Sequence, residues 1–308
     1  MPLDLDMQLI LDVVGYDHFA EAMKGGAEGV LAKIRAGGSS APPARLVARS
    51  EDRRLESPHG PLDVRVYWPP GEGPFPILLN FHGGGWVTGS VAGDDLRCQR
   101  LTMAAGCIMI SVEYRLAPEH PFPAGLDDCY SAFLWAHKNA RALGGHPDWI
   151  AVGGASAGGN LAAAVALRAR NAQGPMPRFQ FLLYPALDGR RVEDEVPGGP
   201  YYVTRAAMNW YWSQYAGGAD RSNPLLSPLV APDKSDLPPA LIITAELDPL
   251  AAEGRAYAAM LATAGVPVEL VEIPGMVHGF VSLGPELRQT RDALTLAAAA
   301  LNRVFESA

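Results

Sequence analysis

The chain has 308 residues, of which 48% are hydrophobic and 19% are charged. This balance supplies a large buried core and excludes a mostly disordered chain. The formal net charge of −8 opposes binding to nucleic-acid phosphates, so nucleic acid is not an expected partner. Because single sheet-based enzymes often reach this length, we expect one large α/β domain with a cap.

The sequence also gives no sign of a membrane or secretory segment. No apolar run approaches the roughly 18 residues that a membrane-spanning helix needs, and residues 1–12 are acidic where a secretory signal is basic. We therefore expect no membrane partner and a cytoplasmic location. The three cysteines contain no Cys-x-x-Cys pair, which suits a reducing compartment, and we interpret them as small buried hydrophobic residues.

From Leu46 onward, short β-rich runs alternate with longer helical runs, which is typical of a mostly parallel sheet covered by helices on both faces. The predicted strands are Arg45–Asp52, Leu62–Trp68, Phe75–Phe81, Ile108–Tyr114, Trp149–Gly153, Arg178–Tyr184, Ala240–Ala245 and Pro267–Ile273. The first two alternate polar and apolar residues and should form an antiparallel edge. The predicted helices are Asp95–Ala105, Gly125–Ala142, Ala157–Gln173, Ala251–Ala264 and Pro285–Phe305. Functional groups are expected at the carboxyl ends of the strands.

Two segments, residues 1–44 and 186–228, do not follow this alternation. The first has helical periodicity in Met7–Val14 and Ala20–Ile34 and ends in a Gly, Ser and Pro-rich stretch. The second carries aromatic residues that form either the core of a cap or part of the substrate site. They are Tyr201, Tyr202, Trp210, Tyr211, Trp212 and Tyr215. We predict that the two segments form a helical cap, and that 45–185 and 229–308 form the sheet domain.

A candidate nucleophile lies in the string Gly154-Ala155-Ser156-Ala157-Gly158, which follows a predicted strand and opens a predicted helix. This context indicates a nucleophile elbow, a tight turn that lifts the serine hydroxyl above the sheet. The flanking glycines would remove clashes in that turn. The alternative is a Gly-rich helix start that only packs tightly or holds a phosphate.

The string His82-Gly83-Gly84-Gly85 follows the third predicted strand. Glycines allow backbone amides to approach the oxyanion that forms during acyl transfer. We assign the oxyanion hole to the amides of Gly84, Gly85 and Ala157, with Gly83 shaping the loop. The alternative is an ordinary Gly-rich turn, and we interpret His82 as a structural hydrogen-bonding residue rather than a base.

A serine hydroxyl needs an adjacent imidazole to act as a nucleophile at neutral pH, and the imidazole needs an anion to fix its tautomer. His278 lies directly after the last predicted strand, and Asp248 follows Ala240–Ala245. The order Ser156, Asp248, His278 is the order expected for this architecture. Glu246 is the alternative acid.

Other titratable residues fit these roles less well. Asp127 and Asp128 precede the serine, which is the wrong order for the acid. The remaining histidines fall in the cap, at edges or on helices, and are interpreted as surface or satisfied polar residues. They are His18, His59, His120, His137 and His146.

Six strings together resemble the hormone-sensitive-lipase-like family of microbial esterases, over nearly the whole chain. They are His82–Gly85, Tyr114–Ala124, Ser156–Leu161, Asn223–Pro228, Asp248–Leu250 and His278–Phe280. The resemblance implies an α/β-hydrolase fold with an eight-stranded sheet and a helical lid. It also implies a Ser156–Asp248–His278 triad that hydrolyses short and medium acyl esters without metal or organic cofactor. Dimers are common in this family, so a homodimer is a possible assembly.

The chain departs from the family pattern at two places. Ala155 stands where an acidic residue is common, and Ala251-Ala252 replaces a charged pair. We hypothesise that apolar packing has replaced a polar network near the elbow. From strand ends and cap, the candidate substrate-binding residues are Trp86, Tyr184, Leu187, Tyr202, Trp210 and Phe280. The alternatives are the same triad acting on lactones, amides or carbamates, or a non-catalytic binding protein on this fold.

Overall fold

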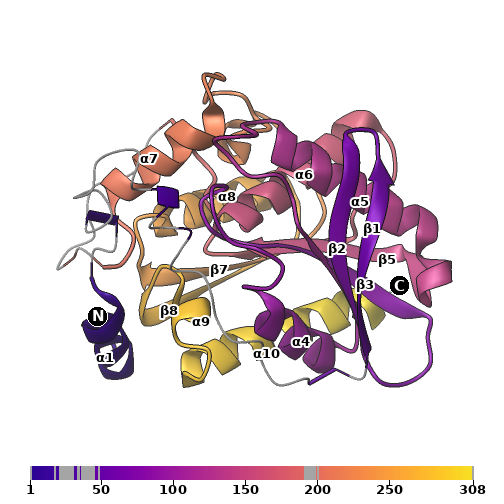
Figure 1. The fold of residues 1–308 in the computed structure, drawn as a ribbon, viewed down its shortest axis with the longest axis horizontal. Helices are drawn as coiled ribbons and strands as arrows, with labels where there is room; N and C mark the ends of the chain where they lie inside the picture. Colours follow the sequence, from indigo (N-terminus) through magenta and orange to yellow (C-terminus); the bar gives the residue numbers. More distant parts are fainter. Residues whose placement is uncertain are drawn as a thin grey trace.

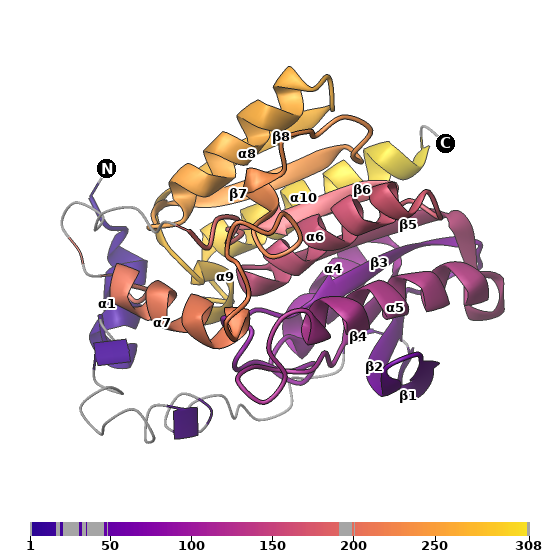
Figure 2. The same cartoon turned by 90° about the horizontal axis from the view of Figure 1, so that it is seen from above.

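Eight strands form one sheet in the order β1-β2-β4-β3-β5-β6-β7-β8 (Figures 1 and 2). The structure is a computed structural model that describes residues 2–16, 19–20, 31–32, 35, 46–47, 49–190, 199 and 201–306. The strands are β1 Arg49–Ser57, β2 Gly60–Trp68, β3 Phe75–Phe81, β4 Ile108–Val112, β5 Gly145–Ala155, β6 Phe179–Leu183, β7 Ala240–Leu247 and β8 Val268–Val277. The predicted number of strands is confirmed, and so is the antiparallel edge, because β1–β2 and β2–β4 are antiparallel and the other pairs are parallel.

The helices cover both faces of the sheet, as the alternation predicts. The larger ones are α1 Leu5–Val14, α4 Asp95–Ala105, α5 Ala124–Asn139, α6 Ala157–Ala172, α7 Arg205–Ala216, α8 Ala251–Thr263 and α10 Arg288–Glu306. The short ones are α9 Phe280–Leu283 and two 3-10 turns, Arg141–Leu143 and Pro228–Val230. Helices α5, α6 and α8 pack in one apolar cluster on one face. Helices α1, α4 and α10 pack in a second cluster on the other face.

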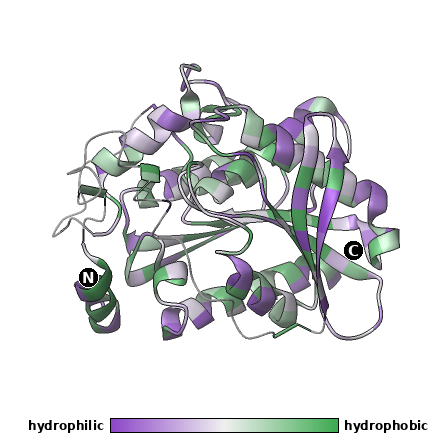
Figure 3. Cartoon of the chain, viewed as in Figure 1, coloured by the Kyte–Doolittle hydropathy of each residue, from purple (hydrophilic) through white to green (hydrophobic). Residues whose placement is uncertain are grey.

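The central strands are hydrophobic on both faces because each face is covered by helices. Every residue of β4 and β6 is buried, and only the first two residues of β3 are partly exposed. Figure 3 shows this contrast, since the outer strand β1 is largely hydrophilic. The sheet therefore offers a rigid platform whose strand ends hold loops in fixed positions.

The structure differs from the predicted boundaries mainly at β1, β5 and β8, and β5 begins four residues before Trp149 and ends two residues after Gly153. Strand β1 begins four residues later than predicted and runs to Ser57, because the tight hairpin pairs Ser57 with Gly60 and sets the register. Strand β8 continues four residues past Ile273, which brings its end directly to His278. Most of the helix predicted over Ala20–Ile34 lies outside the described residues, as does the stretch 37–43.

Helix α7 lies over the carboxyl ends of the strands (Figures 1 and 2). Thr204 caps its N-terminus, and the Thr204 hydroxyl accepts a hydrogen bond from the Ala207 amide. Gly217 caps its C-terminus in a left-handed conformation. The N-terminal segment meets it through Phe19, whose ring lies 5.6 Å from that of Trp210. Contact between the two segments fits the predicted cap, whose boundaries stay a prediction.

Candidate active site

Ser156 occupies the single residue between β5 and α6. Its φ of 57° and ψ of −117° lie outside the regions that non-glycine residues favour, at a cost of about 1–3 kcal/mol. Two backbone hydrogen bonds to the end of β6 and the residues after it hold this conformation. The Ser156 amide donates to the Leu183 carbonyl at 2.8 Å, and the Ala186 amide donates to the Ser156 carbonyl at 3.3 Å. The neighbouring strand therefore fixes the hydroxyl at the sheet edge.

The two glycines of the elbow are needed because the backbone passes very close to β3. A Cβ built on Gly158 would lie 1.9 Å from the Phe81 carbonyl oxygen, and one on Gly154 would lie 2.4 Å from it. Neither distance is physically possible without a backbone shift. The glycines thus have the clash-relieving role predicted from the sequence.

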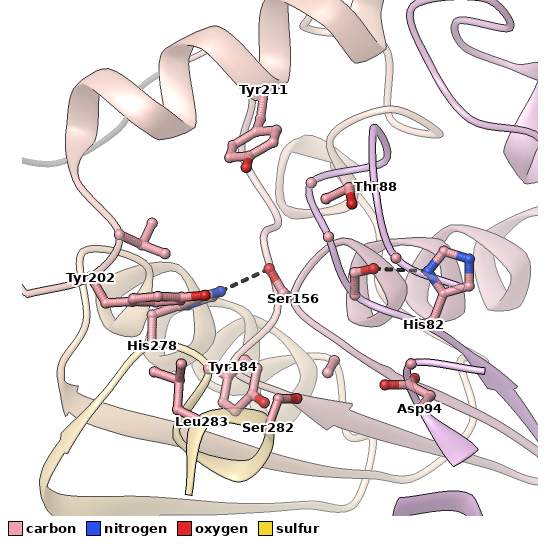
Figure 4. A pocket seen from close by; sticks show the side chains of 18 of the residues that line it. His82, Thr88, Asp94, Ser156, Tyr184, Tyr202, Tyr211, His278, Ser282 and Leu283 are labelled. Carbon is pink, nitrogen blue, oxygen red and sulfur yellow. Dashed lines mark hydrogen bonds between the residues drawn. The ribbon is translucent and has the colours of Figure 1, made fainter. Parts of the chain in front are cut away.

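The structure brings Ser156, His278 and Asp248 together although they lie on three different strand ends. His278 Nε2 is 2.8 Å from Ser156 Oγ, and His278 Nδ1 is 2.7 Å from Asp248 Oδ2. Figure 4 shows the imidazole pointing at the serine from below the cap. The second carboxylate oxygen of Asp248 accepts the Leu250 amide at 2.8 Å, and the Asp248 side chain is fully buried. The carboxylate is therefore held in one orientation.

The alternative residues are engaged elsewhere. Glu246 accepts the Gly275 amide at 2.8 Å, which orients the turn within β8 rather than the imidazole. Asp127 pairs with Arg168, and Asp128 accepts three hydrogen bonds from Arg115, all away from the elbow. Among the described histidines, only His278 contacts Ser156.

The loop after β3 lies beside the serine, since a Cβ built on Gly83 would be 3.8 Å from Ser156 Cβ. Gly84 and Gly85 have φ values of 116° and 60°, which favour glycine. A Cβ on Gly84 would lie 2.3 Å from the Thr88 carbonyl oxygen, and one on Gly85 would strike the Tyr211 ring. Among the described residues, no acceptor binds the amides of Gly84, Gly85 or Ala157. They remain free to donate to a ligand.

His82 lies beneath this loop and does not contact Ser156. Its ring stacks on Tyr114 with centroids 4.2 Å apart, and its Nδ1 is 2.8 Å from the Gly83 carbonyl oxygen. Burial lowers the pKa of His82, so the ring is kept neutral. These contacts match the structural role predicted from the sequence.

A cavity of about 720 Å³ opens above Ser156 and His278 (Figure 4). Tyr184 and Tyr202 line it, as the sequence predicts, together with Gly83, Gly84 and Gly85. Other residues in its lining were not predicted. They are Arg35, Leu116, Val203, Met208, Tyr211 and Leu283. Tyr211 belongs to the aromatic cluster noted in the sequence, but only the helix orientation shows which of the aromatic residues faces the serine.

Four predicted contacts do not line this cavity, and each has a packing role instead. Trp86 is buried and stacks on Tyr215 with ring centroids 4.4 Å apart. Leu187 is fully buried, and Phe280 packs against the Tyr184 ring from behind. Trp210 points away to Phe19. Position near a strand end or in the cap therefore does not by itself place a side chain in this cavity.

Each of the two family departures has a buried alanine, and one of these alanines lies two residues from a buried carboxyl group on α8. Ala155 packs in the apolar cluster of α4 and α10, and Ala251 is buried at the start of α8. Nearby Glu253 is 4% exposed and accepts the amides of Leu187 and Asp188 at 2.5 and 2.9 Å. Burial raises the pKa of Glu253 to about 8. A polar contact is thus retained here, and the loss of a wider network stays a hypothesis.

Comparisons with known proteins identify the class. A family model described as alpha/beta hydrolase fold matches residues 78–282. The carboxylesterase NlhH of Mycobacterium tuberculosis is 39% identical over 295 residues, which cover 91% of each chain. The arylesterase of Saccharolobus solfataricus is 34% identical over 313 residues, covering 99% of this chain and all of that one. A hyperthermophilic esterase from Pyrobaculum calidifontis superposes with a TM-score of 0.85 at 36% identity, covering 98% and 99%.

The chain therefore belongs to the α/β-hydrolase family. Within it, the chain is a member of the hormone-sensitive-lipase-like esterases, which confirms the resemblance found in the sequence motifs. Within the described ranges, no helix has the length and hydrophobicity needed to cross a membrane. The same ranges contain no group of three or more side chains suited to hold a metal ion.

Replacing Gly158 with alanine should distort the elbow, because the new methyl group cannot fit against the Phe81 carbonyl. We expect a loss of at least about 1–3 kcal/mol of stability, measured by urea unfolding, together with loss of esterase turnover. Gly174→Ala is the matched control, since a Cβ there meets no atom within 4 Å. Equal stability of the two variants would contradict this account of the elbow.

Replacing Glu253 with glutamine should change how the free energy of unfolding of the protein depends on pH. The folded-state pKa of about 8 lies above the unfolded value of 4.5, so the folded protein binds the extra proton between these pH values. The wild type should therefore lose stability relative to Glu253→Gln as pH rises from 5 to 8, by at most about 1.4 kcal/mol per pH unit. Melting temperatures of both proteins across this range provide the measurement. Parallel curves would show that Glu253 titrates normally.

Proposed function

We propose that this enzyme hydrolyses carboxylic esters of short to medium acyl chains through an acyl-enzyme on Ser156. His278 acts as the general base and Asp248 fixes its tautomer and balances its developing charge. The observation that carries the proposal is the continuous hydrogen-bonded relay from Ser156 Oγ through both ring nitrogens of His278 to Asp248.

In the first half-reaction, His278 Nε2 accepts the Ser156 proton while Oγ attacks the ester carbonyl. The negative oxygen of the tetrahedral intermediate is bound by the amides of Gly84, Gly85 and Ala157. Ala157 is the first residue of α6, where amides lack helical acceptors and the helix dipole favours negative charge. Removal of one such donor typically costs about 3–4 kcal/mol in the barrier.

The intermediate then collapses, and the imidazolium of His278 protonates the departing alcohol. Water enters, gives its proton to His278 Nε2 and attacks the acyl-enzyme carbonyl, and the same amides bind the second oxyanion. Release of the acid restores the Ser156 hydroxyl. Asp248 accepts the Leu250 amide and faces His278 Nδ1, so it holds the imidazole in one orientation through both half-reactions.

The shape of the cavity supports short and medium acyl chains. Tyr202, Tyr211 and Leu283 border the space around the serine, and α7 covers it (Figure 4). A volume of about 720 Å³ is within the range of small-molecule sites, which bury most of a bound ligand. A long triglyceride would need an open groove instead. Location in the cytoplasm, and the possible homodimer, stay predictions.

Ser156→Ala should lower kcat for a chromogenic acetyl ester by at least about 10⁴-fold, because the nucleophile is removed. The matched control is Ser131→Ala, a partly exposed serine on α5 outside the cavity lining, which should retain most of its activity. The turnover rates of both purified variants are measured from the absorbance of the chromogenic product that they release. Turnover by the Ser156 variant near the wild-type rate would assign the nucleophile to another residue.

A series of p-nitrophenyl esters from acetyl to palmitoyl tests the substrate range. We expect kcat/KM to be highest for the shorter chains and to fall at least about tenfold for palmitoyl, because the covered cavity cannot enclose the longer chain. All esters should be measured below their micelle-forming concentrations. A maximum at palmitoyl would contradict the proposed range while leaving the triad intact.

A further inference from the structure

A second cavity adjoins the catalytic one between α4 and the α9–α10 segment. It has a volume of about 220 Å³, and its lining shares Gly93, Asp94 and Ser282 with the catalytic cavity. Figure 4 shows Asp94 and Ser282 at the lower side of the catalytic cavity, away from Tyr211. Because these residues belong to both linings, the second space begins at the polar lower side of the catalytic cavity.

The cavity contains a buried cation that is only half paired. The Arg97 side chain is 7% exposed and lines the second cavity. Its Nη2 donates to Asn80 Oδ1 at 3.1 Å and also to Asp94. Its Nε and Nη1 are buried and have no acceptor among the described residues. Buried N–H groups without acceptors are unfavourable, and the guanidinium that carries them belongs to a residue that lines the adjoining space.

The charges of the lining favour an anion. Two guanidinium groups, Arg97 and Arg100, and one carboxylate, Asp94, line the cavity, so their formal sum is one positive charge. Asp94 Oδ2 is already engaged by both Arg97 and Asn80, which reduces its repulsion of a second anion. Arg100 pairs with Glu286, whose side chain is 75% exposed, and solvent weakens that pair.

The rest of the lining is suited to a short carbon chain. Leu96, Val281 and Leu294 contribute apolar surface, and the Thr290 hydroxyl already donates to the Gly284 carbonyl. At roughly 30 Å³ per water, the volume holds a few waters or a short aliphatic segment with one polar end. A carboxylate matches the positive charge of a lining that contains Arg97 and Arg100, and its oxygens can accept hydrogen bonds from guanidinium groups.

We propose that this second cavity is a subsite for a carboxylate group, anchored by Arg97. The inference rests on the proposed esterase function and extends it to a class of substrate or product. The carboxylate belongs either to a half-ester, in which a free acid lies opposite the cleaved ester, or to the short-chain acid released by hydrolysis. Both sources present the same group to Arg97.

The first arm of the test compares two esters of equal length. Ethyl hydrogen glutarate carries a carboxylate where ethyl pentanoate has a methyl group. We expect Arg97→Gln to lower kcat/KM for the half-ester relative to the neutral ester by tenfold or more, because charge-assisted hydrogen bonds are lost. Arg97→Lys should retain part of the preference because it keeps the cation. Arg303→Gln, which removes an exposed arginine on α10, should leave the ratio unchanged.

The second arm measures free acid binding without turnover. Pentanoate should raise the melting temperature of the wild type saturably, whereas pentanol should not, and Arg97→Gln should abolish the difference. Loss of half-ester preference identifies the substrate as the source of the carboxylate. Loss of pentanoate binding alone identifies the product.

A wild-type enzyme that shows neither half-ester preference nor stabilisation by pentanoate beyond that by pentanol would overturn the proposal, even if Arg97→Gln fails to fold. So would an Arg97→Gln variant that folds and keeps both responses, since Arg97 would then only support Asp94 and Asn80. Turnover of ethyl pentanoate by the wild type reports on the proposed esterase function separately.

Discussion

The close approach of two backbone segments at the elbow is the constraint on which the site depends. Strand β3 passes so near the start of α6 that a methyl group at Gly158 would overlap the Phe81 carbonyl. This approach places the loop after β3, with its free amides, beside the serine. It also forces Ser156 into a strained conformation that the bonds to Leu183 and Ala186 maintain. The serine and the free amides of this loop are thus positioned by the same contact.

Parallel pairing of the central strands then brings Asp248 and His278 to the same edge of the sheet as Ser156. β7 and β8 end beside each other, so Asp248 and His278 follow neighbouring strands and meet without a long connection. The cap covers the space above Asp248 and His278. Its Tyr211 packs against Gly85 in the loop after β3, where a side chain would not fit. Rigid strands therefore set the distances between Ser156, His278 and Asp248, and residues of α7 line the space above them.

The fold, and the three side chains that meet at Ser156, could be predicted because both leave strong local signals in the sequence. Strand–turn–helix context identified Ser156, and position after a strand identified Asp248 and His278. The lining of the cavity could not be predicted in the same way. Whether Trp210 or Tyr211 faces the serine depends on how α7 is rotated, and Trp86 is withdrawn into the core by stacking on Tyr215. The buried settings of Arg97 and Glu253 could not be predicted, because several of the residues around them are distant in the sequence. Asn80 and Val281 lie near Arg97, and Leu187 contacts Glu253.

The most direct test of the central claim is to label the enzyme with an aryl alkylphosphonate ester and to locate the adduct by peptide mass spectrometry. Such a reagent mimics the tetrahedral intermediate and reacts only with an activated nucleophile beside an oxyanion hole. The account predicts one adduct per chain, on the peptide containing Ser156, formed in parallel with loss of activity. Complete inactivation with the adduct on another residue, or full activity after labelling of Ser156, would contradict it.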